Sequence, residues 1–139
     1  MDYNTNIKIT FSIFGCFFDP NDLTKLIGIV PTNIWIEGEV IPNNKKNKKR
    51  EESAWEYSIY SDTIYLEEIS DRLVSIFKEK VIIVNDYVDQ TNGLTIKFDI
   101  ILEIAEEQGV VLYFNKSFLN MVSELGAEIE VDNYILKNE

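Results

Sequence analysis

Histidine is absent from this sequence of 139 residues, and cysteine occurs once, as Cys16. Mechanisms that use a histidine base, and metal sites built on imidazole, are therefore excluded. A single cysteine forms neither an internal disulfide nor a structural zinc site, and it fits a reducing compartment. Because Phe14, Phe17 and Phe18 lie beside it in the sequence, we expect a buried thiol rather than a reactive one.

Long hydrophobic runs are also missing, and no apolar stretch is long enough to cross a membrane. Residues 9–18 (ITFSIFGCFF) are apolar, but they have no basic leader and no small-residue cleavage site, and an Asp-Pro pair follows at once. These features predict a cytoplasmic protein. The length, together with a hydrophobic fraction of 45%, predicts a single domain over residues 1–139 with a sizeable core of its own.

Positive charge is scarce and unevenly placed. The net charge is −11, and five of the 13 basic residues lie within residues 45–50, so the rest of the chain carries −16. Such acidity keeps a protein soluble, and it also repels nucleic acid and anionic lipid while attracting a basic partner. No aromatic residue interleaves the basic run to stack bases, and glutamates follow it, so we expect a solvated loop there and no nucleic-acid or membrane partner.

Apolar periodicity divides the chain into alternating short elements. Helix 19–28 has Asp19 as its N-cap, Pro20 in its first turn and Gly28 at its end, and Asn115 caps the last helix. Residues 80–92 mix β-branched residues with helical spacing, and we favour a helix. Strands are predicted at 6–16, 33–40, 54–60, 94–106, 110–115 and 127–136, and the other helices at 66–79 and 116–126.

The order of these elements predicts an α+β fold, with a mainly antiparallel sheet of about six strands and helices packed on one face. The first six elements, β-α-β-β-α-β, match a ferredoxin-like core, and a C-terminal β-α-β unit follows. Residues 107–109 are expected to form a tight hairpin turn between the strands at 94–106 and 110–115.

Three segments resemble the motifs of an uncharacterised bacterial family, catalogued as domain of unknown function 4279. They are FDPNDLTKLIGIVPTNIWIEGE at 18–39, WEYSIY at 55–60 and LGAEIEVDNY at 125–134, and together they span nearly the whole chain. The resemblance implies a small bacterial α+β domain and no particular activity. Asp132 and Tyr134 belong to the closing signature of that family, and we expect them to lock the last strand through a hydrogen bond.

Two tryptophans mark the predicted hairpin. Trp35 and Trp55 could sit opposite each other with Tyr57 nearby, as a core anchor. The same three residues could instead form the wall of a ligand pocket or an interface hot spot. We favour the core. In a regular strand, however, Trp35 would point to the same side of the sheet as Glu37 and Glu39, unless Gly38 introduces a bulge.

Acidic side chains alternate outward along the last strands of the predicted sheet. A solvated sheet face is the ordinary interpretation of this pattern. The sharper hypothesis is an acidic platform that docks a basic protein. A carboxylate metal cluster would need a convergence that alternation alone cannot establish. The residues are Asp99, Glu103, Glu128, Glu130 and Asp132.

These observations predict a non-catalytic interaction module without a cofactor. Its most concrete form is an immunity-type inhibitor that binds a basic toxin through an acidic surface. One alternative is a carboxylate-based metal-dependent hydrolase that uses Asp99, Glu103 or Asp132. Another is a small-molecule binder lined by the three aromatic residues named above. An exposed strand edge could also pair two copies into a homodimer.

Overall fold

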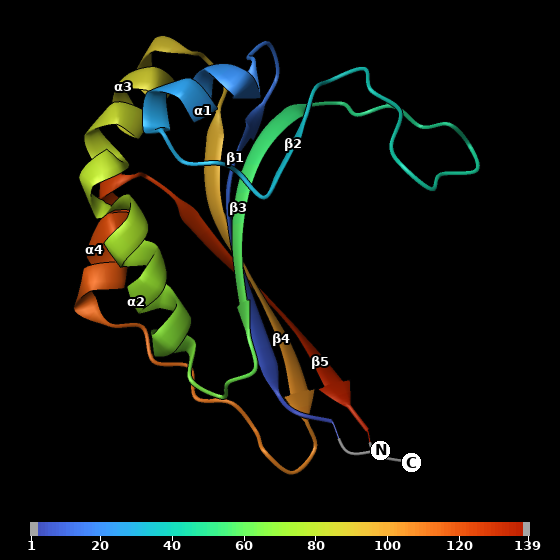
Figure 1. Cartoon of the computed structure of the whole chain (residues 1–139), viewed down its shortest axis with the longest axis vertical. Helices are drawn as coiled ribbons and strands as arrows, with labels where there is room; N and C mark the ends of the chain where they lie inside the picture. The colour runs from blue at the N-terminus through green and yellow to red at the C-terminus, as the bar shows by residue number, and fades with distance from the viewer. Residues whose placement is uncertain (1–2, 138–139) are drawn as a thin grey trace.

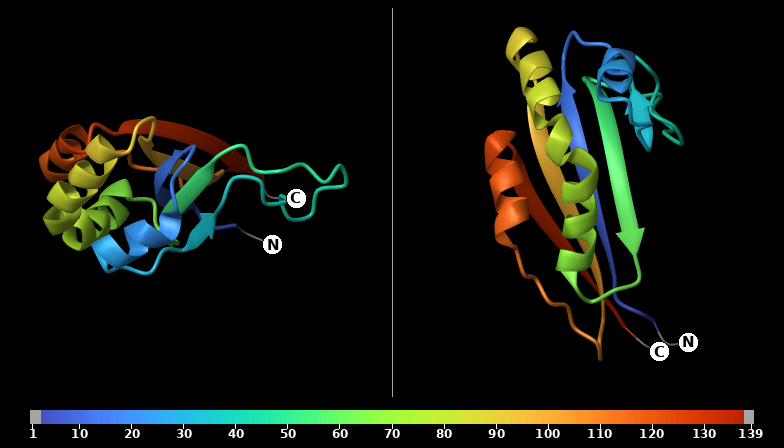
Figure 2. Two further views of the ribbon diagram at one scale, coloured as in Figure 1. Left: turned by 90° about the horizontal axis from the view of Figure 1, so that it is seen from above. Right: turned by 60° about the vertical axis from the view of Figure 1, so that its left-hand side comes forward.

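The computed structural model describes residues 3–137, and it places all helices on one face of one sheet, so that no helix covers the other face (Figures 1 and 2). The sheet has the strand order β2-β3-β1-β4-β5. Its strands are β1 (Asn6–Gly15), β2 (Asn33–Trp35), β3 (Ser53–Ser61), β4 (Thr95–Ala105) and β5 (Glu128–Leu136). The helices are α1 (Pro20–Ile27), α2 (Leu66–Phe77), α3 (Val81–Gln90) and α4 (Lys116–Glu124), and the 3-10 turn η1 (Lys78–Lys80) joins α2 to α3.

Strand β1 lies at the centre of the sheet and pairs antiparallel with both β3 and β4. The short β2 pairs antiparallel with β3, whereas β5 runs parallel to β4. Parallel neighbours need a return connection of a dozen or more residues, and the segment that contains α4 supplies it. The architecture is therefore α+β with a mixed sheet. The helix favoured for residues 80–92 is confirmed, as α3 with the end of η1 before it.

Residues 110–115 do not form the sixth strand that their composition predicted. Val111 makes one isolated bridge, to Tyr65 just before α2. Val110 and Phe114 are partly buried against the core. Their apolar character reflects the packing of a connecting segment. Because β5 runs parallel to β4, the chain must return from the end of β4 to the opposite end of the sheet before β5 begins. The predicted hairpin before this segment is therefore wrong, and the sheet has five strands.

The core lies between the helices and the face of the sheet that they cover. Phe11 of β1 is at its centre, stacked on Phe98 at 5.0 Å between ring centroids. It also meets Phe77 of α2 at 4.7 Å and Trp55 of β3 at 6.1 Å, both edge to face. Such aromatic pairs add about 1 kcal/mol each beyond their buried area. The cluster thus joins three strands to α2.

The predicted caps of α1 and the predicted N-cap of α4 are confirmed. The backbone N–H of Asn21 donates to Asp19 Oδ1 over 2.9 Å, and Gly28 ends α1 with a φ of 75°. At α4, the N–H of Phe118 donates to Asn115 Oδ1 over 3.0 Å. These caps satisfy backbone groups that a helix leaves unpaired at its ends.

The two tryptophans do not face each other, which corrects the prediction. The register of β2 pairs Trp35 with Ala54, and Ile34 with Trp55. Because successive side chains of a strand point to opposite faces, the two indoles lie on opposite sides of the sheet. Trp55 is fully buried on the helix side, where its Nε1 donates to Thr24 Oγ1 over 3.0 Å.

Residues 36–52 leave the sheet as a long excursion, so β2 ends well before the predicted boundary (Figure 1). One isolated bridge, between Val40 and Lys49, closes this loop, which carries the basic run as expected. Cys16 beside it is half-buried, with its Sγ 3.6 Å from the carbonyl oxygen of Glu51. None of the helices formed by residues 3–137 has the length and apolar character that spanning a membrane requires.

Candidate functional site

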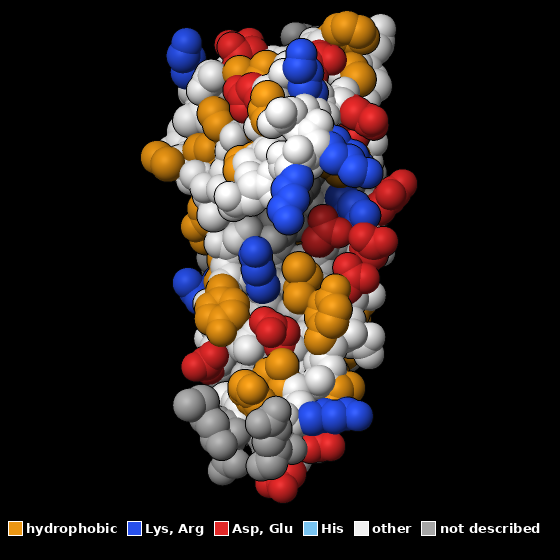
Figure 3. Space-filling model, turned by 90° about the vertical axis from the view of Figure 1, so that its right-hand side faces the viewer, with side chains coloured by type: hydrophobic (Ala, Val, Ile, Leu, Met, Phe, Trp, Pro, Cys, Tyr) orange, Lys and Arg blue, Asp and Glu red, His pale blue; other side chains and the backbone are white. Residues whose placement is uncertain are grey.

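The uncovered side of the sheet gathers the residues that alternate with the core positions of β1, β3, β4 and β5, and Figure 3 looks onto it. We call this surface the open face. The strand registers place its side chains in rows, so that Glu56, Ser12 and Lys97 are neighbours across β3, β1 and β4. Its members are Lys8, Thr10, Ser12, Glu56, Ser58, Tyr60, Lys97, Asp99, Ile101, Glu103, Glu128, Glu130, Asp132 and Tyr134.

The open face is acidic. All five carboxylates predicted to alternate outward lie on it, and Glu56 joins them from β3. Against these six carboxylates stand two lysines, Lys8 and Lys97, so the formal charge of the face is −4. This charge is part of the −16 that the chain carries outside residues 45–50.

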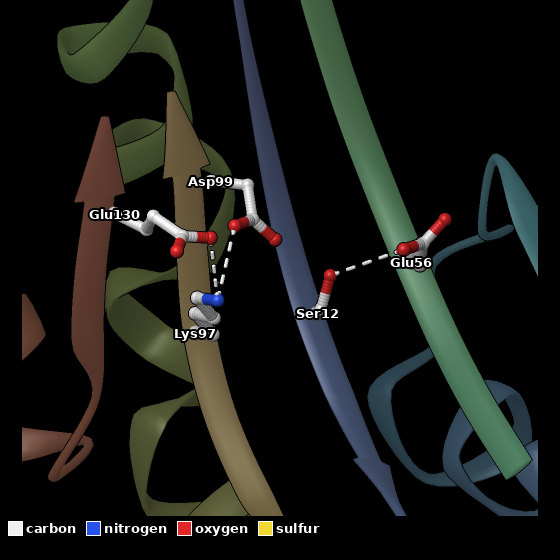
Figure 4. A network of polar contacts seen from close by, with 5 residues as sticks. All are labelled: Ser12, Glu56, Lys97, Asp99 and Glu130. Carbon is white, nitrogen blue, oxygen red and sulfur yellow. Dashed lines mark hydrogen bonds and ion pairs between the residues drawn. The ribbon is translucent and has the colours of Figure 1, made fainter. Parts of the chain in front are cut away.

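Lys97 bridges β4 and β5 on this face (Figure 4). Its Nζ lies 2.7 Å from Glu130 Oε2 and 3.5 Å from Asp99 Oδ1. The hydrogen bond and charge of Lys97 lower the pKa of Glu130, and the bond to Glu130 raises the pKa of Lys97. Burial raises the pKa of Asp99, and Lys97 offsets only part of this effect.

Glu56 lies on the other side of β1 from Asp99. Ser12 Oγ donates to Glu56 Oε2 over 3.3 Å (Figure 4). Burial raises the pKa of Glu56; the bond from Ser12 acts in the opposite direction, and the charge of Asp99 adds to the increase. Both carboxylates therefore sit where ionisation is disfavoured, and a cation arriving at this face would stabilise their charged form.

Hydroxyl groups form the floor between these two carboxylates. Ser12 and Thr10 are only 3% and 7% exposed, and Thr10 Oγ1 lies 2.8 Å from Ser58 Oγ. With β1 between them, the strands that carry Glu56 and Asp99 are about 10 Å apart, so the two carboxylates are not a proton-sharing pair. The arrangement suits separate contacts with cationic groups rather than acid–base chemistry at one point.

Metal binding by three converging side chains finds no support on this surface. Among residues 3–137, no group of three or more cysteine, aspartate or glutamate side chains comes together in a way that could hold a metal ion. Asp99, Glu103 and Asp132, the residues of the hydrolase alternative, are instead spread over two strands.

The aromatic residues predicted as a binding group are divided between the two faces. Trp35 stacks under the guanidinium of Arg50, whose Cζ is 4.1 Å from the ring centroid. It lines a hollow of about 320 Å³ with Phe14, Ile41 and residues 48–52. Trp55 and Tyr57 face the helices and do not line that hollow, and the Tyr57 ring meets Phe77 edge to face at 5.2 Å.

Exposed tyrosines accompany the carboxylates at the other end of the open face. Tyr60 and Tyr134 are each 58% exposed. Tyr60 donates its hydroxyl to Asp62 Oδ1 over 3.4 Å, and desolvation, followed by the charge of Asp62, raises its pKa. Within residues 3–137 the Asp132 and Tyr134 side chains make no hydrogen bond, so the expected lock on the last strand is not present in the described structure.

Among the members of the open face that sequence reasoning missed are the three that form its central polar contacts, Glu56, Ser12 and Lys97. Lys97 is two residues before Asp99 in the same predicted strand, so the alternation of side chains already places it on the same face of the sheet. Glu56 and Ser12 also alternate with buried residues of their strands. Their proximity, however, depends on the register of β1 against β3, which the sequence does not display.

The family match covers every strand and helix described above. A family model described as a domain of unknown function (DUF4279) matches residues 5–136. The chain belongs to the DUF4279 family. Neither a curated protein nor a solved structure matches it. The matched range of this DUF4279 domain includes the whole open face, from Lys8 of β1 to Tyr134 of β5.

Proposed function

We propose that this DUF4279 domain is a non-catalytic interaction module whose open face binds a basic protein. The supporting observation is the formal charge of −4 on a sheet face that no helix covers. Complementary charge would speed association and select the partner. An immunity-type inhibitor of a basic toxin is the most concrete form of the proposal.

The distribution of charge favours a partner that presents several cations. Glu56 and Asp99 are held where burial disfavours their ionised forms, so a lysine or arginine placed over them offsets a cost already present in the free protein. The attraction extends along β4 and onto β5 through three more carboxylates, Glu103, Glu128 and Asp132. Tyr60 and Tyr134 add exposed aromatic surface of the kind that is enriched at protein interfaces.

Capture with matched variants tests this proposal. Tagged wild type is compared with an open-face variant, Glu56→Gln/Asp99→Asn/Glu103→Gln, and with a control variant that removes three exposed carboxylates from the helical layer, Glu79→Gln/Asp86→Asn/Asp89→Asn. We expect wild type and control to retain the same basic protein from native cells at low ionic strength. The open-face variant should bind the purified partner at least roughly tenfold more weakly.

Two outcomes would contradict the proposal. One is that wild type retains no basic protein at an ionic strength low enough for charge to act over about 10 Å or more. The other is that the open-face and control variants bind the purified partner equally well. In the second case the contact surface would lie outside the open face.

We also infer that β1–β4 with α1 and α2 form a ferredoxin-like core. The order β2-β3-β1-β4 and the antiparallel pairing of each neighbour support this inference. Helices on one face of such a sheet leave the other free for binding. The β4-α4-β5 unit would then enlarge that free face by one strand.

A further inference from the structure

Strand β5 ends the sheet, and its outer edge has no strand partner among residues 3–137. It is 9 residues long, and both of its faces are largely exposed. Val131 is 41% exposed and Ile135 is 54% exposed, although both point to the side that the helices cover elsewhere. Figure 1 shows the C-terminal half of β5 running clear of the helices. Long, flat, uncovered edges are unusual because they accept another strand.

Its two faces differ in chemistry. Glu128, Glu130 and Asp132 lie on the open face, at alternate positions. Val131 and Ile135 lie on the opposite face, where they are exposed. A strand that pairs with this edge would therefore meet carboxylates on one side and, on the other, two apolar side chains with Asn133 between them. Such a strand would itself need alternating basic and apolar side chains.

Charge disfavours a second copy of the chain at this edge in the registers centred on Val131 and Asp132. Antiparallel pairing about a two-fold axis at Asp132 would set that carboxylate opposite its own copy, and an axis at Val131 would set Glu130 opposite Asp132. Like charges directly opposite each other destabilise a strand pair. Two-fold antiparallel pairing would also join two open faces of like charge into one surface. Charge therefore favours a basic strand over a second copy.

We propose that β5 takes up an extended segment of the basic partner as an additional strand of the sheet. The inference rests on the proposed function and specifies how the partner binds. Backbone hydrogen bonds along the free edge supply affinity, and the alternation of carboxylates and apolar side chains supplies specificity. Lysine or arginine side chains of the segment lie over Glu128, Glu130 and Asp132, and its apolar side chains cover Val131 and Ile135.

A peptide of the length of β5, 9 residues, with lysine and valine in alternation, tests the strand geometry. One control peptide has the same composition with its lysines grouped at one end. A second control keeps the alternating order but carries N-methyl groups on every amide of one edge, so it retains charge and loses the backbone donors. We expect the alternating peptide to bind at least roughly tenfold more tightly than either control. Alternate backbone amides of β5 should also gain protection from hydrogen exchange.

Protein variants provide the matching test. Val131→Lys/Ile135→Lys places positive charge on the side of β5 that the valines of the peptide should cover. This double substitution should abolish the preference for the alternating peptide. The control Val30→Lys/Ile82→Lys adds the same charge at positions that are 79% and 74% exposed, away from β5, and should leave the preference intact. Circular dichroism establishes that each variant is folded before binding is measured.

The outcomes separate this inference from the proposed function. Equal binding of the three peptides, or no binding of the alternating one, overturns strand addition. In either case the open-face variant with the purified partner still decides the proposed function. Sedimentation of the free protein addresses the competing occupant. Concentration-dependent association that Val131→Lys/Ile135→Lys removes would assign the edge to a second copy and overturn the proposal.

Discussion

The indole of Trp55 and the hydroxyl of Thr24 are joined by a hydrogen bond in which Nε1 donates to Oγ1 over 3.0 Å. Trp55 belongs to β3 and is fully buried, whereas Thr24 belongs to α1. The bond satisfies the only polar atom of a large core side chain and holds α1 over the sheet. It also explains why this tryptophan is unavailable for binding.

Replacing Thr24 should reveal the value of that bond. Thr24→Val keeps the branched shape but leaves the buried indole N–H without an acceptor, so we expect a loss of about 1–3 kcal/mol in the free energy of unfolding. Thr24→Ser retains the hydroxyl and should lose less than Thr24→Val. Urea denaturation of the two variants measures the difference. Equal stability of the two would mean that the indole N–H does not depend on Thr24.

Gly15 provides a second test of packing, at the end of β1. A Cβ added there would lie 2.6 Å from the carbonyl oxygen of Gly93, a backbone atom that cannot move alone. We expect Gly15→Ala to lower the free energy of unfolding by roughly 1–3 kcal/mol. Gly109→Ala is the comparison: a Cβ at that position would meet no atom within 4 Å, so only the left-handed φ of 69° opposes the change. Thermal unfolding that ranks Gly109→Ala as the more damaging change would contradict this account.

Much of the fold could be predicted because local patterns determine it. Alternation in β1 and β4 identifies which residues are buried, and the same alternation places Asp99 and Glu103 on the open face. The caps at Asp19 and Asn115 are equally local, since each side chain bonds to a backbone group within three residues. Such features follow from the sequence without knowledge of distant contacts.

The remaining features depend on long-range arrangement. Trp35 points away from Trp55 because the register of β2 against β3 decides which side of the sheet each side chain faces. A shift of that register by one position would move Trp35 to the side of Trp55. Residues 110–115 have strand-like composition, yet the parallel pairing of β5 with β4 makes them a connection. The contact of Lys97 with Glu130 joins residues 33 positions apart. Local composition contains none of this information.

The raised pKa of Glu56 predicts a pH-dependent effect of its removal. Because burial favours the protonated form, the charged carboxylate costs stability in the folded state at neutral pH. Glu56→Gln should therefore be more stable than wild type at neutral pH. The gap should shrink as pH falls through the raised pKa and should vanish below the ordinary value of 4.5, where both states hold the proton.

Chemical denaturation of both proteins over this pH range measures the gap. Ser12→Ala serves as a companion variant, because it removes the hydrogen bond that lowers the pKa of Glu56. In that variant the pH dependence should begin at a higher pH than in wild type. A stability gap between Glu56→Gln and wild type that does not change with pH would show that the effect comes from packing rather than charge.

Lys97 offers a prediction opposite in sign to those for the acidic residues. Its ammonium group neutralises part of the open face through Glu130 and Asp99, so Lys97→Gln should bind the alternating lysine–valine peptide more tightly than wild type. Glu130→Gln should bind it more weakly. Because the ion pair is exposed, either change should alter the free energy of unfolding by no more than about 1 kcal/mol.

Titration calorimetry at two ionic strengths should show the steeper salt dependence for Lys97→Gln, since that variant carries the more negative face. Weaker binding by Lys97→Gln would mean that the position in which Lys97 holds Glu130 contributes more to recognition than the net charge of the face.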